Sequence, residues 1–204
     1  FSYGDDLAAG RILASQLRLH LADALHRFHT QNKLILGICT GFQVLVQTGL
    51  LVPPDDSGPI ITLGWNDRGK FEDRWVHLRV AGTHSVFLSG IDSLTLPIAH
   101  AEGKFVARDS DALAELDRAG QLVLRYTRPT TPSDRHEPVP YPANPNGSQL
   151  DVAGICDPTG RVFGLMPHPE RYITPTQHPR WTREVLPEIG DGLQIFQNAV
   201  AFCV

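Results

Sequence analysis

The chain has 204 residues, of which 42% are hydrophobic and 20% charged, and its formal net charge is −4. This size and composition suit one globular domain with a sizeable core, and the scattered basic residues argue against a nucleic-acid-binding face. No apolar stretch reaches the roughly 20 residues that a membrane-spanning helix needs. Three cysteines without a C-x-x-C pair favour neither a disulfide framework nor a structural metal, and we expect a cytoplasmic protein.

The first third of the chain predicts two helices around one buried strand. Residues 6–28 carry leucines at four-residue spacing, which favours an amphipathic helix. Residues 33–39, KLILGIC, form an apolar run without alternation, as expected of a strand covered on both faces in a parallel sheet. Residues 41–49 favour a helix that Gly49 ends, and residues 53–70 favour a loop with one short strand.

The rest of the chain predicts strands, a long loop and a closing helix. Strands are expected in RWVHLRV (74–80), LPIAHAEG (96–103), QLVLRY (121–126), DVAGIC (151–156) and RVFGLM (161–166). A proline- and asparagine-rich loop is expected over residues 128–148 and a helix over residues 192–202. Strands and helices mix along the sequence, so the fold class is α/β, with antiparallel strands in the middle.

One cysteine lies at the junction between the predicted strand 33–39 and the helix that follows. It stands in GICTG, with Gly37 and Gly41 two residues to either side. Small neighbours relieve the crowding of a sharp strand-to-helix turn, as in the nucleophile elbow of serine enzymes. The helix amino terminus favours a thiolate, and the N–H of Thr40 can point at an oxyanion. Cys39 is therefore a candidate nucleophile; the alternative is a buried structural cysteine.

A thiol nucleophile needs an imidazole base and a group that orients it. His168 directly follows a predicted strand, stands between two prolines, and is followed two residues later by Glu170. In an extended segment these two side chains lie on the same side, so Glu170 can hold the imidazole. A capping role for His168 and an ion pair of Glu170 with Arg171 are the alternatives. His100 and Glu102 in HAEG have the same spacing and form a rival pair.

These motifs together resemble those of a known enzyme family. LGICTGFQVL with a distant GLMPHPER resembles class I (triad) glutamine amidotransferases. FSYGDDLAAGRI, YPANPNGS and DVAGICDPTGRVFGLMPHPER are similar to the glutaminase subunits of phosphoribosylformylglycinamidine synthase. The resemblance implies a three-layer αβα sandwich around a mostly parallel, flavodoxin-like sheet, as one amidotransferase domain over residues 1–204.

The resemblance also implies a reaction and its partners. Cys39 would attack the side-chain amide of L-glutamine, His168 would carry the proton to ammonia, and Glu170 would orient His168. A glutamyl thioester would form, and ammonia would pass to a synthase subunit of the purine pathway, with a small accessory subunit as a further partner. No cofactor is expected in this chain, and ATP with Mg²⁺ would belong to the synthase.

Four further residues correspond to substrate-binding positions of the family. Thr40 would supply part of the oxyanion hole, where the family usually has asparagine, and Gln43 would contact the substrate. Asn66 and Phe71 lie where the family has residues of the glutamine pocket. Arg68 departs from the family pattern and places a long cation near the pocket or the partner surface.

The chain opens with FSYGDD and contains a single methionine, Met166. Family members begin with a strand, a helix and a second strand that end in a glycine pair, which supplies the other half of the oxyanion hole. We therefore expect an N-terminally truncated domain of low activity if nothing precedes Phe1. Two other hypotheses about the function stay open. The chain could be another cysteine hydrolase or amidotransferase of the same fold, or a catalytically incomplete binding domain.

Overall fold

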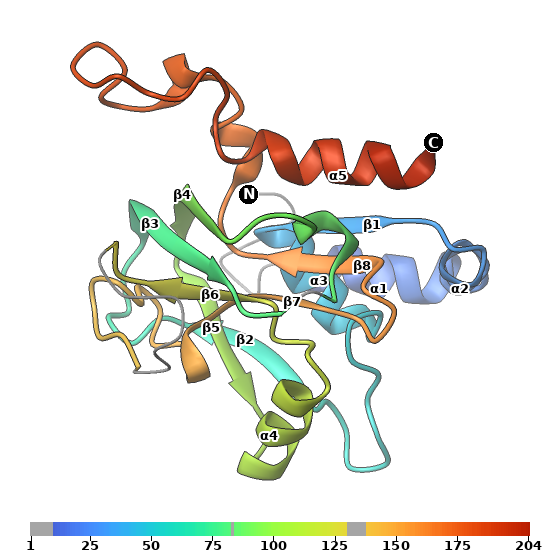
Figure 1. Cartoon of the computed structure of the whole chain (residues 1–204). Coiled ribbons are helices and arrows are strands. Elements are labelled where there is room, and N and C mark those ends of the chain that lie inside the picture. Colours follow the sequence, from blue (N-terminus) through green and yellow to red (C-terminus); the bar gives the residue numbers. More distant parts are fainter. Residues whose placement is uncertain (1–9, 83, 130–137) are drawn as a thin grey trace.

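The computed structural model describes residues 10–82, 84–129 and 138–204, and shows an α/β fold with five α-helices and eight strands in these ranges (Figure 1). The FSYGDD segment lies outside the described residues. The helices are α1 (Arg11–His20), α2 (Ala22–Thr30), α3 (Thr40–Thr48), α4 (Ser110–Arg118) and α5 (Leu193–Cys203). The strands are β1 (Ile35–Ile38), β2 (Ile61–Trp65), β3 (Glu72–Val80), β4 (Ser93–His100), β5 (Glu102–Ala107), β6 (Leu124–Thr127), β7 (Val152–Cys156) and β8 (Val162–Leu165).

The main sheet has six strands in the order β1-β8-β7-β6-β3-β4. Only β1 and β8 run parallel, and the other four neighbouring pairs are antiparallel. A second, two-stranded sheet pairs β2 with β5. The α/β class is confirmed, but the expectation of a mostly parallel sheet is wrong for the described strands. The physical reason is connectivity: short turns such as 157–160 join β7 to β8, and a tight turn permits only antiparallel neighbours.

Alternating side chains of β8 divide the core into two clusters, one on each face of the sheet. Phe163 and Leu165 join the cluster that contains Ile195 of α5, whereas Val162 joins the cluster that contains Phe42 of α3. Helix α4 packs on the same cluster as α3, and Figure 1 shows α5 on the opposite side from α4. Helices thus cover both faces of the sheet, which gives the three expected layers.

Strand β1 and helix α3 form as the sequence predicts. The leucines and isoleucines of residues 34–38 contribute to both clusters, which explains the unbroken apolar run. Helix α3 ends at Gly49, which adopts the left-handed conformation with φ 76°. β1 thus delivers the chain into α3 at residue 39, where strand and helix meet.

One prediction about the helices is wrong, and one helix was not predicted. The single helix expected over residues 6–28 is two helices, because the chain breaks at Leu21 (φ −127°, ψ 11°). Leu21 and Phe28, two apolar residues of the predicted amphipathic helix, are 50% and 44% exposed. Helix α4 was not predicted, although Asp109 caps it by accepting a 2.8 Å hydrogen bond from the Ala112 N–H. No helix within the described ranges is long and apolar enough to cross a membrane.

Candidate active site

Cys39 lies at the junction of β1 and α3 with a backbone of φ 52° and ψ −108°. Non-glycine residues rarely adopt a positive φ, and such strain is typical of functional turns. The Cys39 N–H donates to the Leu165 carbonyl at 2.9 Å, which extends the pairing of β1 with β8. The thiol is buried and donates a weak hydrogen bond to the Ala99 carbonyl at 3.9 Å. The turn holds the sulfur at the carboxyl end of the parallel strand pair.

The two glycines that flank Cys39 have different surroundings. A Cβ at Gly37 would lie 2.5 Å from Leu45 and 2.7 Å from the Gly41 backbone, so only glycine allows α3 to approach β1 this closely. A Cβ at Gly41 would meet no atom within 4 Å. The expected steric need therefore applies to Gly37 and not to Gly41, which faces open space.

The structure brings His168 and Glu170 together. His168 Nδ1 lies 2.6 Å from Glu170 Oε1, whereas Arg171 Nε lies 3.8 Å from the same oxygen. The His168 N–H donates to the Pro97 carbonyl at 2.8 Å, which ties the base to β4. Residues 169–171 form a short 3₁₀ turn rather than the extended segment assumed from the sequence. The turn brings the carboxylate to the ring nitrogen Nδ1 by a different backbone path.

The electrostatics of the site favour a charged imidazole. Burial disfavours the imidazolium, but interactions with Cys39 and Glu170 outweigh it and raise the pKa of His168 to about 9. Burial also opposes the Glu170 carboxylate, but the hydrogen bond and charge of His168 lower the pKa of Glu170. His168 Nε2 is buried and has no hydrogen-bond partner among the described residues. This nitrogen is thus left available for the thiol or a substrate, because Nδ1 is held by Glu170.

The substrate-binding residues predicted from the sequence have different surroundings. Thr40 is the first residue of α3, where backbone N–H groups have no partner within the helix. Gln43 is buried, and its Nε2 donates to the Glu102 carbonyl at 2.8 Å. Asn66 is also buried, but its side chain builds the loop by hydrogen bonds to residues 68 and 70. Phe71 is 53% exposed.

Arg68 lies on the surface beside this loop. Its guanidinium stacks on the Tyr141 ring, with Cζ 4.4 Å from the ring centroid, and its Nε is 3.5 Å from Glu72 Oε1. Arg74 contacts the same ring and the same carboxylate. The cation is therefore bound to its own chain rather than directed at the thiol.

The rival pair in HAEG has a different arrangement from the pair in HPE. His100 is 3% exposed, and neither of its ring nitrogens has a hydrogen-bond partner among the described residues. Burial and the nearby His168 lower the pKa of His100 to about 3. Glu102 instead lines a separate cavity. His100 therefore lacks the carboxylate partner that would make it a base, yet it lies beside the candidate triad.

Sequence analysis did not identify Tyr126 or Asn146. The Asn146 Nδ2 donates to the Gly103 carbonyl at 2.9 Å and contacts the Tyr126 hydroxyl at 3.0 Å. Burial raises the pKa of Tyr126, and the charge of Cys39 adds to this effect. The turn-forming asparagines of ANPNGS were a usable signal, since asparagine at a turn often binds backbone groups.

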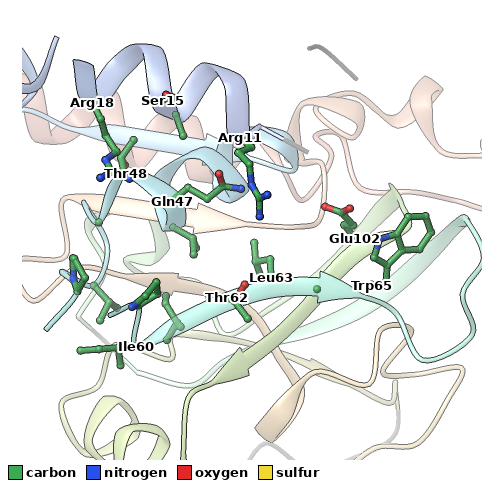
Figure 2. Close-up of a pocket in the computed structure, with 18 residues that line it drawn as sticks. Arg11, Ser15, Arg18, Gln47, Thr48, Ile60, Thr62, Leu63, Trp65 and Glu102 are labelled. Atoms are coloured by element: carbon green, nitrogen blue, oxygen red, sulfur yellow. The ribbon is translucent and has the colours of Figure 1, made fainter. Parts of the chain in front are cut away.

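A cavity of about 900 Å³ lies between α1, the C-terminal half of α3 and β2 (Figure 2). Arg11, Ser15 and Arg18 line it from α1, and Trp65 and Glu102 line its far end. None of Cys39, His168 and Glu170 is among its lining residues. Within the described ranges, no cluster of three or more metal-ligating side chains occurs.

Comparisons with known proteins bear on this site. Residues 1–203 match the sequence profile of the family described as CobB/CobQ-like glutamine amidotransferase domain. The phosphoribosylformylglycinamidine synthase subunit PurQ of Dehalococcoides mccartyi is 50% identical over 201 residues, which cover 98% of this chain and 75% of that protein. The PurQ subunit of Methanococcus maripaludis is 42% identical over 214 residues, with 99% and 78% covered. The solved structure of PurLQS from Thermotoga maritima has a TM-score of 0.71 at 30% identity and covers 100% of this chain and 76% of that one.

Proposed function

This chain belongs to the CobB/CobQ-like glutamine amidotransferase family, and we propose that it is the glutaminase component of phosphoribosylformylglycinamidine synthase. It hydrolyses L-glutamine and supplies ammonia to a synthase subunit in purine biosynthesis. The 50% identity to a PurQ subunit over nearly the whole chain carries this assignment. The strained Cys39 and the paired His168 and Glu170 support it chemically.

The proposed mechanism begins with attack of the Cys39 sulfur on the side-chain amide carbon of glutamine. The thiol proton moves to His168 Nε2 and from there to the amide nitrogen, the C–N bond breaks, and ammonia leaves a glutamyl thioester. Because its pKa is raised to about 9, His168 can hold that proton at neutral pH. Water then attacks the thioester, His168 takes a proton from it, and glutamate and the free thiol are released.

The supporting residues have distinct proposed roles. Glu170 fixes the orientation of His168 through the 2.6 Å contact and stabilises its imidazolium. The Thr40 N–H stabilises the oxyanion from the first turn of α3. Gln43, Asn66 and Phe71 shape the glutamine pocket; for Asn66 this means holding the loop, since its side-chain amide is already bound within it.

The partners follow from the assignment. The family resemblance and the PurLQS neighbour support assembly with a synthase subunit, and we extend this to a small accessory subunit. ATP and Mg²⁺ are assigned to the synthase, because this sequence has no G-x-x-x-x-G-K-[ST] phosphate-binding loop. The three cysteines are all free thiols, which supports a cytoplasmic location.

A glutamine-mimicking diazoketone tests the function directly. The chain together with its synthase subunit is incubated with the reagent, and the adduct is located by mass spectrometry. We expect one adduct on Cys39 that excess glutamine blocks, because the reagent needs both the thiolate and the pocket. Cys203 is exposed and Cys156 is buried, so they report non-specific alkylation and unfolding respectively. Labelling of Cys203 alone, or Cys39 labelling that glutamine does not reduce, would contradict the assignment.

A further inference from the structure

His100 ends β4, the strand whose backbone contacts both the thiol and the base. The Ala99 carbonyl accepts the weak hydrogen bond from the Cys39 thiol, and the Pro97 carbonyl accepts the hydrogen bond from the His168 N–H. The next residue along this strand end is His100, and its ring is near enough to His168 for the charge of His168 to lower the pKa of His100. His100 thus lies next to the strand residues that contact the thiol and the base.

Unpartnered polar atoms concentrate around this place. Eight buried side-chain atoms lack a hydrogen-bond partner among the described residues, and five of them belong to Gln43, His100, Asn146 and His168. Buried polar groups are nearly always paired, so an unpaired cluster requires an explanation. His168 Nε2, which must meet the leaving nitrogen of the substrate, belongs to this cluster, because it too has no hydrogen-bond partner among the described residues. Its neighbours are therefore suited to pair with the same part of the substrate.

The His100 ring is held in place by close packing. A Cβ on Gly103 would lie 2.4 Å from His100 Cε1, 2.6 Å from its Nδ1 and 3.1 Å from Asn146 Nδ2. Glycine is thus required for the His100 ring and the Asn146 amide to lie against the same backbone. The Asn146 Nδ2 already donates to the Gly103 carbonyl and the Tyr126 hydroxyl, and its Oδ1 is an acceptor without a partner among the described residues.

The two residues offer neutral acceptors. Burial keeps the His100 imidazole uncharged, so one ring nitrogen carries a lone pair and the other an N–H, and the Asn146 oxygen carries two lone pairs. A carboxamide –NH₂ can donate to both, whereas a carboxylate has only acceptors and would face them unpaired. If His100 and Asn146 served only to fill the core, apolar side chains of similar size would do so without burying unpaired polar atoms.

We propose that His100 and Asn146 form a subsite that accepts hydrogen bonds from the carboxamide nitrogen of glutamine and so selects an amide over a carboxylate. The subsite rests on the proposed glutaminase function. It orients the –NH₂ group toward His168 before the C–N bond breaks, and it disfavours the product glutamate, which has no N–H at that position.

A substrate that lacks the N–H donors separates this role from a structural one. Glutamate γ-methyl ester reacts through the same thiol and thioester, but its leaving group is methanol. We therefore compare kcat/KM for glutamine and for the ester in the complex with the synthase, for His100→Leu and His100→Gln. His77→Leu is the matched control, because His77 lies on β3 and contacts Thr95 outside the site.

We expect His100→Leu to lower kcat/KM for glutamine at least about tenfold and for the ester less than threefold. His100→Gln retains a neutral acceptor, so it should restore glutamine turnover to within about threefold of the wild type. The melting temperature of each variant shows whether it folds. His77→Leu should leave kcat/KM unchanged for both substrates. Equal losses for both substrates in folded variants, or no loss for glutamine, would overturn the subsite. A wild-type complex that hydrolyses neither substrate would instead overturn the proposed function.

Discussion

Two segments of this chain share the spacing His-x-Glu but have opposite environments. In HPE, His168 is bound to Glu170 at 2.6 Å, and its pKa is raised to about 9. In HAEG, neither nitrogen of His100 has a hydrogen-bond partner in the part of the chain that the structure describes, and its pKa is lowered to about 3. The same two residue types therefore yield a charged imidazole in one place and a neutral imidazole in the other. Burial and the contacting groups, which for His168 are Cys39 and Glu170, decide which role a histidine takes, and spacing alone does not.

The largest expected effect is the loss of the base. His168→Gln removes the group that carries the thiol proton, so kcat for glutamine should fall about 10³–10⁴-fold. His100→Gln keeps a neutral acceptor and should reduce kcat by no more than about threefold. Glutamate production by the complex with the synthase measures both. The comparison breaks if the His100 variant loses more activity than the His168 variant.

Glu170→Gln sharpens the comparison by giving His168 a neutral partner. We expect kcat to fall about 10²-fold, because the imidazole loses the charge that holds and stabilises it. The Glu170 carboxylate helps to raise the pKa of His168, so this pKa should drop below about 9. The alkaline limb of the pH profile of kcat should then move to lower pH. An unchanged limb would mean that Glu170 does not act on His168.

The two histidines should give stability opposite dependences on pH. The pKa of His168 is raised from 6.5 to about 9, so its contribution is complete below pH 6.5 and is lost as pH rises through 9. The pKa of His100 is lowered from 6.5 to about 3, so the unfolded chain takes up a proton that the folded chain refuses, and stability falls as pH drops from 6.5 toward 3. Each effect is on the order of a few kcal/mol.

Denaturant unfolding at a series of pH values measures how the free energy of unfolding changes with pH. His100→Leu should flatten the loss of stability between pH 6.5 and pH 3 and leave the alkaline side unchanged. His168→Gln should flatten the alkaline side instead. Identical profiles for the two variants would contradict the assignment of charged and neutral environments.

The smallest expected effect concerns the glycine that packs on His100. Gly103→Ala would place a Cβ 2.4 Å from the ring, so His100 must shift, at a cost of about 1–3 kcal/mol in the free energy of unfolding. Gly64→Ala is the matched control on the paired strand β2, because a Cβ there meets no atom within 4 Å. Thermal unfolding compares the two. Equal effects would show that the ring is not tightly held.

Sequence patterns predicted the local elements better than their pairing. The unbroken apolar run before Cys39 predicted a strand covered on both faces, and β1 is that strand. The direction of neighbouring strands depends on contacts between distant segments, which hydrophobic periodicity does not encode, so the antiparallel majority was missed. Leucine spacing likewise could not show that the backbone breaks at Leu21.

The candidate site divides in the same way. The glycines that flank Cys39 and the prolines that flank His168 are local sequence signals. The fold brings the two side chains close enough for Cys39 to raise the pKa of His168. The state of His100 depends on its packing against Gly103 of β5 and Asn146 of a distant loop. Asn66 was assigned to the pocket, but its side chain binds its own loop, a contact that sequence spacing does not reveal.

Titration of the two imidazoles by NMR tests the central claim most directly. The ring signals are recorded for the wild-type chain bound to its synthase subunit. The signals that disappear in the His168→Gln and His100→Leu variants assign the two imidazoles. We predict that His168 keeps its proton until about pH 9 and that His100 shows no titration above about pH 3 while the chain stays folded. A His100 signal that titrates near pH 6.5, or a His168 signal that loses its proton there, would contradict the account.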